Sequence, residues 1–189
     1  MKVPVEVSAR HVHLSEGDMK KLFGDGYCLT QRRELSQPGQ FLCEERVEII
    51  GPKSSFGSVA ILGPTRSKTQ VEISITDSRK LGIETFIRES GDLDGTAGCV
   101  LRGPRGEIEL ESGVIIAKRH IHMHPHDAGK IGAENGQICK VKIENEERSL
   151  IFDDVVVRVS DKFALAMHID TDEGNAVNWE TDTLGAVIL

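Results

Sequence analysis

The sequence predicts a mainly β protein made of two related small domains, with short helices between the strands. Three observations support this prediction. Short segments rich in valine and isoleucine recur along the chain, several of them alternating with polar residues. Gly-Pro turns of the kind that punctuate antiparallel β structure occur at Gly51-Pro52, Gly63-Pro64 and Gly103-Pro104. A nine-residue segment near the N-terminus also matches a second segment 109 residues later.

The composition limits the class of protein. A chain of 189 residues is long enough for one sizeable domain or two small ones, and 39% hydrophobic with 28% charged residues indicates a soluble globular protein. The net charge of −7 argues against a general binder of nucleic acid or of membranes. No apolar run approaches the roughly 18 residues needed to cross a bilayer. The scattered cysteines and the lack of a signal peptide lead us to expect a cytoplasmic protein.

In the first half of the chain, Ser15 is a good N-cap for a short helix that ends at Gly24. One helical turn is expected over residues 77–82, and residues 27–37 are polar and ambiguous. The expected strands cover residues 3–9, 41–43, 47–50, 59–62, 71–75, 99–101 and 108–110.

In the second half, residues 114–118 form a strand that leads into a histidine-rich stretch. Pro125 is well placed to begin a helix over residues 126–131. Thr171 could cap a last helix, with acidic residues in its first turn. Further strands are expected at residues 138–143, 150–152, 155–159 and 163–169.

The internal match lays residues 6–14 on residues 115–123. Both copies contain an apolar strand, the sequence Arg-His-x-His, an apolar residue and then a short helix that ends at glycine. The simplest interpretation is two related small β domains, each of which contributes one pair of histidines.

These histidine pairs predict a metal site. In an extended strand, residues i and i+2 point to the same face, so His11 with His13, and His120 with His122, each present two imidazoles side by side. Neutral imidazole is the commonest metal ligand in proteins. His168 and one or more carboxylates could complete the site. His124 shares the face of His122 only if the strand continues to it, a point that Pro125 leaves open.

Three arginines add a second signal. Arg66 follows a Gly-Pro turn, where its guanidinium could hold phosphate through two hydrogen bonds. Arg10 and Arg119 directly precede the histidine pairs, so their side chains should point to the opposite strand face. They could bind substrate or form a salt bridge between the domains.

Several motifs together resemble the PduL-type phosphotransacylases, the phosphate propanoyltransferases of propanediol degradation and their relatives. The similarity extends in matching order from about residue 3 to residue 178. The motifs are Val7-Ser8-Ala9-Arg10-His11-Val12-His13-Leu14-Ser15, Leu62-Gly63-Pro64-x-Arg66, Arg88-Glu89-Ser90-Gly91-Asp92, Arg119-His120-Ile121-His122-Met123 and Met167-His168-Ile169-Asp170-Thr171-Asp172-Glu173.

The resemblance implies two β-barrels capped by short α-helices, one from residues 1–9 plus 118–189 and the other from residues 10–117. It also implies two divalent metal ions per chain, with zinc as the expected metal. His11, His13 and Glu72 would hold the ion that takes the sulfur of coenzyme A. The ion on the phosphate side would be held by His120, His122 and His168. Arg66 would bind phosphate, Arg10 and Arg119 are further substrate-binding candidates, and His124 is an auxiliary candidate near the metal.

The implied reaction converts acetyl- or propanoyl-CoA and phosphate reversibly into acyl phosphate and CoA, by direct attack of phosphate on the acyl carbon. The resemblance also implies a homodimer and a functional link to an acetate or propionate kinase. The first predicted strand begins at Val3, without the extension that members inside bacterial microcompartments carry. A free cytoplasmic enzyme, with no membrane or nucleic-acid partner, is therefore expected.

Two alternatives remain open on the residues alone. One is a dinuclear metallohydrolase that acts on a thioester or a phosphate ester through metal-bound hydroxide. The other is a non-catalytic β-barrel binding module stapled by zinc. Both would keep the histidines, but neither would need Arg66.

Overall fold

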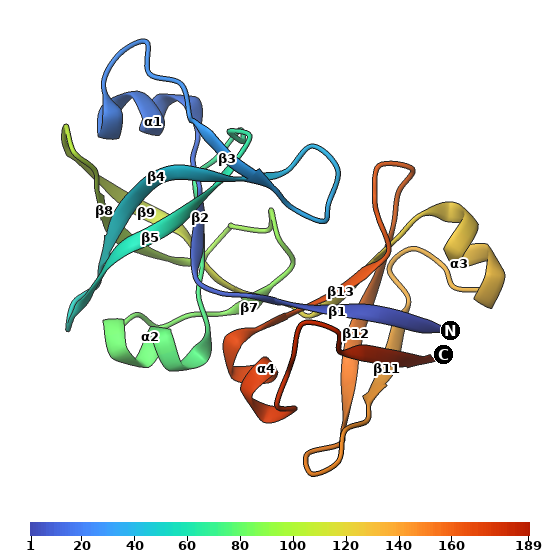
Figure 1. Ribbon diagram of the computed structural model, residues 1–189. Helices are drawn as coiled ribbons and strands as arrows, with labels where there is room; N and C mark the ends of the chain where they lie inside the picture. Colours follow the sequence, from blue (N-terminus) through green and yellow to red (C-terminus); the bar gives the residue numbers. More distant parts are fainter. The chain divides into compact units, whose positions relative to one another are not determined.

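The structure is a computed structural model that describes residues 1–189 (Figure 1). The chain forms two compact units. Unit 1 contains residues 1–9, 36–38 and 118–189, and unit 2 contains residues 10–35 and 39–117. Apart from residues 36–38, the chain therefore passes from unit 1 to unit 2 after Ala9 and returns after Ala117.

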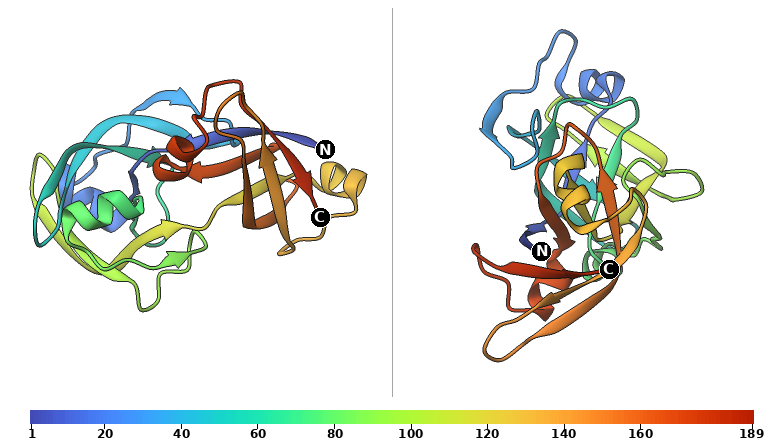
Figure 2. Two further views of the ribbon diagram at one scale, coloured as in Figure 1. Left: turned by 90° about the horizontal axis from the view of Figure 1, so that it is seen from below. Right: turned by 90° about the vertical axis from the view of Figure 1, so that its right-hand side faces the viewer.

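Unit 1 is a closed barrel (Figures 1 and 2). In their order around the barrel its strands are β1 (Lys2–Ser8), β13 (Ala166–Asp170), β10 (His120–Met123), β12 (Leu150–Val159), β11 (Ile138–Ile143) and β14 (Leu184–Ile188). Its helices are α3 (Pro125–Ile131), which follows β10, and α4 (Thr171–Ala176), which follows β13.

Unit 2 closes in the same way, because β8 pairs with both β4 and β9. The strands of this ring, in order, are β4 (Phe41–Ile50), β5 (Ser55–Gly63), β2 (His11–His13), β6 (Gln70–Glu72), β9 (Glu107–Ala117) and β8 (Ala97–Arg102). Two short strands, β3 (Gln31–Glu34) and β7 (Ile87–Arg88), pair with β4 and β9 from outside the ring. The helices are α1 (Glu16–Phe23) and α2 (Ile75–Leu81).

The strand pairings show the internal repeat. In unit 2, β2 runs parallel to β5 and antiparallel to β6. In unit 1, β10 runs parallel to β12 and antiparallel to β13. Each histidine strand is followed by a helix, and so is each antiparallel neighbour. The predicted fold class, mainly β with two barrels capped by short helices and related by a repeat, is confirmed.

Each unit has its own aliphatic core. Val12 lies between the two histidines of β2 and is fully buried in the core of unit 2. Ile121 holds the equivalent place in unit 1. Because strand side chains alternate between the two faces, burial of these residues turns the flanking histidines to the other face of their strands.

Some boundaries differ from the expected ones. Strands β4 and β12 each cover a region where two strands were expected, and β12 continues through Asp154 although this residue has a left-handed backbone (φ 54°). The last helix is capped by Asp170 instead of Thr171, because Asp170 and Glu173 form a reciprocal capping box. The ambiguous polar segment contains β3. No helix has the length and apolar character needed to cross a bilayer.

Candidate metal centres

The first candidate centre lies in unit 2, on neighbouring strands. The register of β2 and β6 places His11 directly opposite Glu72. The nitrogen and oxygen atoms that His11, His13 and Glu72 can offer as ligands lie within 4.8 Å of one another. The two carboxylate oxygens of Glu72 lie 3.5 Å from His11 Nε2 and 3.8 Å from His13 Nε2. We call these three residues triad A.

The charges within triad A suit a cation. Burial, helped by the positive charges of His11 and Arg66, lowers the pKa of His13 to about 3, so its ring is neutral at pH 7. Burial alone would raise the pKa of Glu72, but the neighbouring His11, His13 and Arg66 hold it well below its usual range. The triad therefore offers an ionised carboxylate beside an imidazole that is not protonated.

A network of polar side chains connects triad A to Arg66. The fully buried Gln70 donates hydrogen bonds to Glu72 Oε1 and to Ser90 Oγ (2.8 Å). Its own Oε1 accepts the amide proton of Gly91 (2.8 Å). Arg66 Nη1 donates to the same Ser90 Oγ at 3.1 Å. The 88–92 motif thus fixes the carboxylate ligand candidate and the arginine together.

The second candidate centre lies in unit 1 and repeats this geometry. The register of β10 and β13 places His120 opposite His168. His120, His122 and His168 again offer ligand atoms within 4.8 Å of one another, and we call them triad B. The Nδ1 atom of His120 lies 2.8 Å from the Lys118 carbonyl oxygen, which favours the proton on Nδ1 and leaves Nε2 as the metal-binding nitrogen.

Residues that the sequence did not single out surround triad B. His168 Nδ1 lies 3.7 Å from Glu6 Oε2, and its Nε2 lies 3.5 Å from the buried amide of Gln37. The Gln37 amide also donates to the Ala164 carbonyl oxygen at 3.0 Å. A carboxylate beside the second ring nitrogen is the usual device for orienting a ligand histidine. Strand pairing places Glu6 opposite His168, whereas Gln37 comes from the turn between β3 and β4; both lie far from His168 in the sequence.

Burial strongly affects the protonation of His122 in triad B. Burial lowers its pKa to about 2, and the charges of His120, His168 and Arg158 act in the same direction. Arg158 lies on β12 in register with His122. The ring of Phe163 covers the His122 ring at 4.1 Å between centroids. His122 is therefore neutral at pH 7, as a metal ligand must be.

Arg10 and Arg119, expected to bind substrate or to bridge the domains, each form an ion pair inside their own unit. Arg10 donates from Nε and Nη2 to the two carboxylate oxygens of Asp77, at 3.0 and 2.6 Å. Arg119 Nη1 donates to Glu173 Oε1 at 2.6 Å. Asp77 and Glu173 are equivalent in the repeat, since each lies in the first turn of the helix after a third triad residue.

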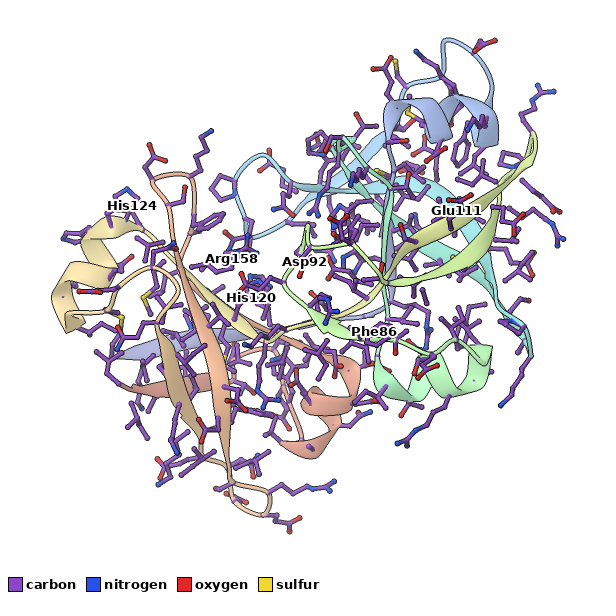
Figure 3. All side chains as sticks on the ribbon, turned by 180° about the vertical axis from the view of Figure 1, so that it is seen from behind. Phe86, Asp92, Glu111, His120, His124 and Arg158 are labelled. Atoms are coloured by element: carbon purple, nitrogen blue, oxygen red, sulfur yellow. The ribbon has the colours of Figure 1, made fainter.

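His124, the auxiliary candidate, is exposed and acts as the N-cap of α3, where its side chain accepts the amide proton of His126. Figure 3 shows the labelled His124 at the start of α3, apart from the labelled His120. Its role beside the metal stays a prediction.

The donor sets of both triads fit a divalent metal ion. The Nδ1 atom of His122 is buried without a hydrogen-bond partner, which is unfavourable for a polar atom unless something else binds there. Three imidazoles, or two imidazoles with a carboxylate, are typical protein ligand sets for zinc that leave a coordination position open. The residues present are therefore consistent with one ion in each triad.

Comparison with known proteins shows which family this chain belongs to. The family model described as phosphate propanoyltransferase matches residues 4–180. A phosphate propanoyltransferase of Thermotoga maritima is 53% identical over 97% of this chain and 88% of its own length. Those of Alkaliphilus metalliredigens and Sebaldella termitidis are 54% and 50% identical, over 100% and 97% of this chain and 88% and 86% of their own lengths. The chain therefore belongs to the phosphate propanoyltransferase family and is an enzyme, a phosphate acyltransferase.

Proposed function

We propose that this enzyme is metal-dependent and converts a short acyl-CoA, acetyl- or propanoyl-CoA, and phosphate reversibly into acyl phosphate and CoA. The observation that carries this proposal is the pair of equivalent triads, each with its ligand atoms within 4.8 Å. Family membership supports the reaction type. The triads add a reason for metal dependence, since each has the donor set of an open zinc site.

In this proposal, His11, His13 and Glu72 hold the ion on the thioester side, and His120, His122 and His168 hold the ion on the phosphate side. When bound, the two ions supply Lewis acidity that stabilises the departing thiolate and reduces the charge of phosphate. The imidazoles of His13 and His122 are already neutral at pH 7 because of burial, so neither has to lose a proton before it binds metal.

Arg66 is the proposed phosphate-binding residue. Its guanidinium already donates to Ser90 through Nη1, which fixes the plane of the group. A planar guanidinium suits phosphate because it can donate two parallel hydrogen bonds. Arg10 and Arg119 were also predicted to bind substrate. Their ion pairs with Asp77 and Glu173 favour Arg66 as the first choice.

The chemical step needs no covalent enzyme intermediate. A phosphate oxygen attacks the acyl carbon, the carbon–sulfur bond breaks, and CoA leaves as the thiolate. The enzyme holds two anionic reactants at reacting distance. The cost of bringing them together is a large part of the activation barrier for such a reaction. A homodimer, and an acetate or propionate kinase that consumes the acyl phosphate, remain part of the proposal.

The test is release of CoA from acetyl-CoA or propanoyl-CoA, followed with a thiol reagent, with and without phosphate. Release that requires phosphate supports the transferase. Release independent of phosphate would favour the metallohydrolase, and bound zinc with no thiol release would favour the binding module. In parallel, His11→Ala and His120→Ala should each lose one zinc ion per chain. Retention of both ions by either variant would contradict the assignment of that triad.

A further inference from the structure

Unit 1 places an arginine directly beside triad B. Strand β12 runs parallel to β10, with Arg158 in register with His122. The preceding pair in this register, Ile121 and Val157, is fully buried in the barrel core. Because side chains alternate along both strands, His122 and Arg158 project together from the opposite face. Neighbouring strands lie only about 4.8 Å apart, so the two side chains are adjacent.

Arg158 has no carboxylate partner. Its guanidinium carbon lies 5.8 Å from the centroid of the Phe163 ring, and this ring also lies against His122. By contrast, Arg119 in the same unit forms an ion pair with Glu173 at 2.6 Å. Half-buried arginines are normally paired with carboxylate or phosphate, since a cation that has lost part of its water is costly without a counter-ion.

The neighbours of Arg158 increase this need for a counter-ion. Triad B consists of three imidazoles, and the nearby carboxylate of Glu6 lies beside His168 Nδ1 (3.7 Å) and forms no ion pair with Arg158. A divalent cation bound there would lie close to the Arg158 guanidinium, and the two positive charges would repel each other. A dianion between them would relieve that repulsion. Inorganic phosphate has the required charge and matches the two-pronged geometry of arginine.

We infer that Arg158 and triad B together form the binding site for the reacting phosphate, and for the phosphoryl end of the acyl phosphate product. This inference rests on the proposed function. It gives unit 1 a phosphate-binding arginine of its own, in addition to Arg66 of unit 2. The phosphate groups of CoA have similar chemistry, so the test must separate the two sources.

The experiment measures the KM for phosphate and the KM for acetyl-CoA separately in Arg158→Met and Arg158→Lys. The methionine variant should raise the KM for phosphate about tenfold or more, which corresponds to loss of a charge-assisted pair of hydrogen bonds. Its KM for acetyl-CoA should not change. The lysine variant keeps the charge without the planar fork, so its KM for phosphate should be intermediate.

Two controls make the result specific. Lys140→Met removes a positive charge from unit 1 at a position that pairs with Asp153, and it should leave both KM values unchanged. Calorimetric titration of inorganic phosphate into the zinc-loaded enzyme should show binding that is weakened by Arg158→Met and not by Lys140→Met. Arg158→Met should hold as much zinc as the parent chain, because the change removes a repelling charge.

An unchanged KM for phosphate in Arg158→Met would overturn the inference, and so would a rise confined to the KM for acetyl-CoA. Loss of zinc from Arg158→Met would also overturn it, because Arg158 would then act through the triad. Failure of the proposed function looks different. In that case the parent chain itself would release CoA without any need for phosphate.

Discussion

The two triads are built on the same framework and differ in one ligand. Glu72 in unit 2 lies opposite His11, in the place that His168 occupies opposite His120 in unit 1. With neutral histidines, triad A carries one negative charge and triad B carries none. A divalent ion would therefore keep its full charge in triad B and only half of it in triad A. In the proposed function, this difference is the reason to assign the anionic phosphate to triad B and the thioester sulfur to triad A.

The arginines that precede the histidine pairs give a second comparison. In both units the arginine pairs with an acidic residue five positions after the third triad residue, Asp77 after Glu72 and Glu173 after His168. The pairs differ in burial. The Asp77 side chain is 5% exposed, whereas that of Glu173 is 18% exposed. Because the ion pair recurs with the repeat, it belongs to the framework that holds each triad.

The largest expected effect comes from removing these arginines. Arg10→Met leaves the buried Asp77 without its partner and should lower the stability of unit 2 by about 3–5 kcal/mol. Arg119→Met also removes a partner, but Glu173 is more exposed than Asp77, so the stability of unit 1 should fall by only about 1–2 kcal/mol. Urea unfolding can separate the units, because the only tryptophan, Trp179, is in unit 1 and the only tyrosine, Tyr27, is in unit 2. If Arg10→Met and Arg119→Met lowered the stability of their own units equally, the proposed difference between the two ion pairs would be contradicted.

The next effect concerns the one ligand that differs. Glu72→His would turn triad A into a copy of triad B, so the chain should still hold two zinc ions. Acyl transfer should fall about 10–100-fold, the range seen when groups around a catalytic metal are altered. Metal content and kcat, measured on the same preparation, check this. Activity close to that of the parent enzyme would show that the charge difference between the triads is unimportant.

A smaller effect should depend on pH and be confined to unit 2. Burial alone would raise the pKa of Glu45, but hydrogen bonds from Tyr27 Oη (2.8 Å) and the Thr30 amide (2.9 Å) lower it. A carboxyl group with a lowered pKa in the folded state stabilises the fold above its unfolded value of about 4.5, and this stabilisation is lost as the pH falls further. Glu45→Gln should therefore cost about 1.5 kcal/mol at pH 7.

The loss in Glu45→Gln should shrink as the pH falls below about 4.5, since the parent carboxyl group then becomes protonated as well. Urea unfolding followed by Tyr27 emission at a series of pH values checks this. The Trp179 signal from unit 1 serves as the internal control. A stability difference that stays constant across the range would rule out the ionised carboxylate as its source.

The smallest effect is chemical and should not change activity. Cys28 is exposed, whereas Cys43, Cys99 and Cys139 are buried. Burial raises the pKa of Cys43 to about 11 and that of Cys99 to about 12, so neither forms the reactive thiolate. A thiol reagent applied to the native chain should modify Cys28 alone. Early labelling of Cys139 would show that the barrel of unit 1 opens more readily than its packing indicates.

The histidine pairs and the repeat could be predicted because each copy of the pattern lies within a short stretch of sequence. A period of two along β2 and β10 brings His11 to His13 and His120 to His122 whatever the rest of the chain does. The equivalence of Glu72 and His168 could not be seen in the same way. Those residues are 96 positions apart, whereas the first histidines are 109 apart, so a match without gaps misses them.

The sequence alone also could not predict which distant residues lie beside the triads. Arg158 lies beside His122 only because β10 and β12 pair in parallel. Gln37, in the turn between β3 and β4, reaches His168 from 131 positions away through tertiary folding alone. The sequence alone does not decide whether Arg10 and Arg119 bind substrate or the other domain. Their partners lie instead in the same unit, on the helix that begins shortly after the third triad residue.

The path of the chain has a consequence for synthesis on the ribosome. All of unit 2 has been made once residue 117 has emerged, so that barrel can close early. Strand β1 must wait, because its partners β13 and β14 are made last. Near the two ends of the chain, Lys2 pairs with Ala186 (Figure 1). If the termini were joined and the chain were opened between Ala9 and Arg10, β1 would be synthesised after its partners β13 and β14. Each barrel would then be translated as a nearly continuous segment.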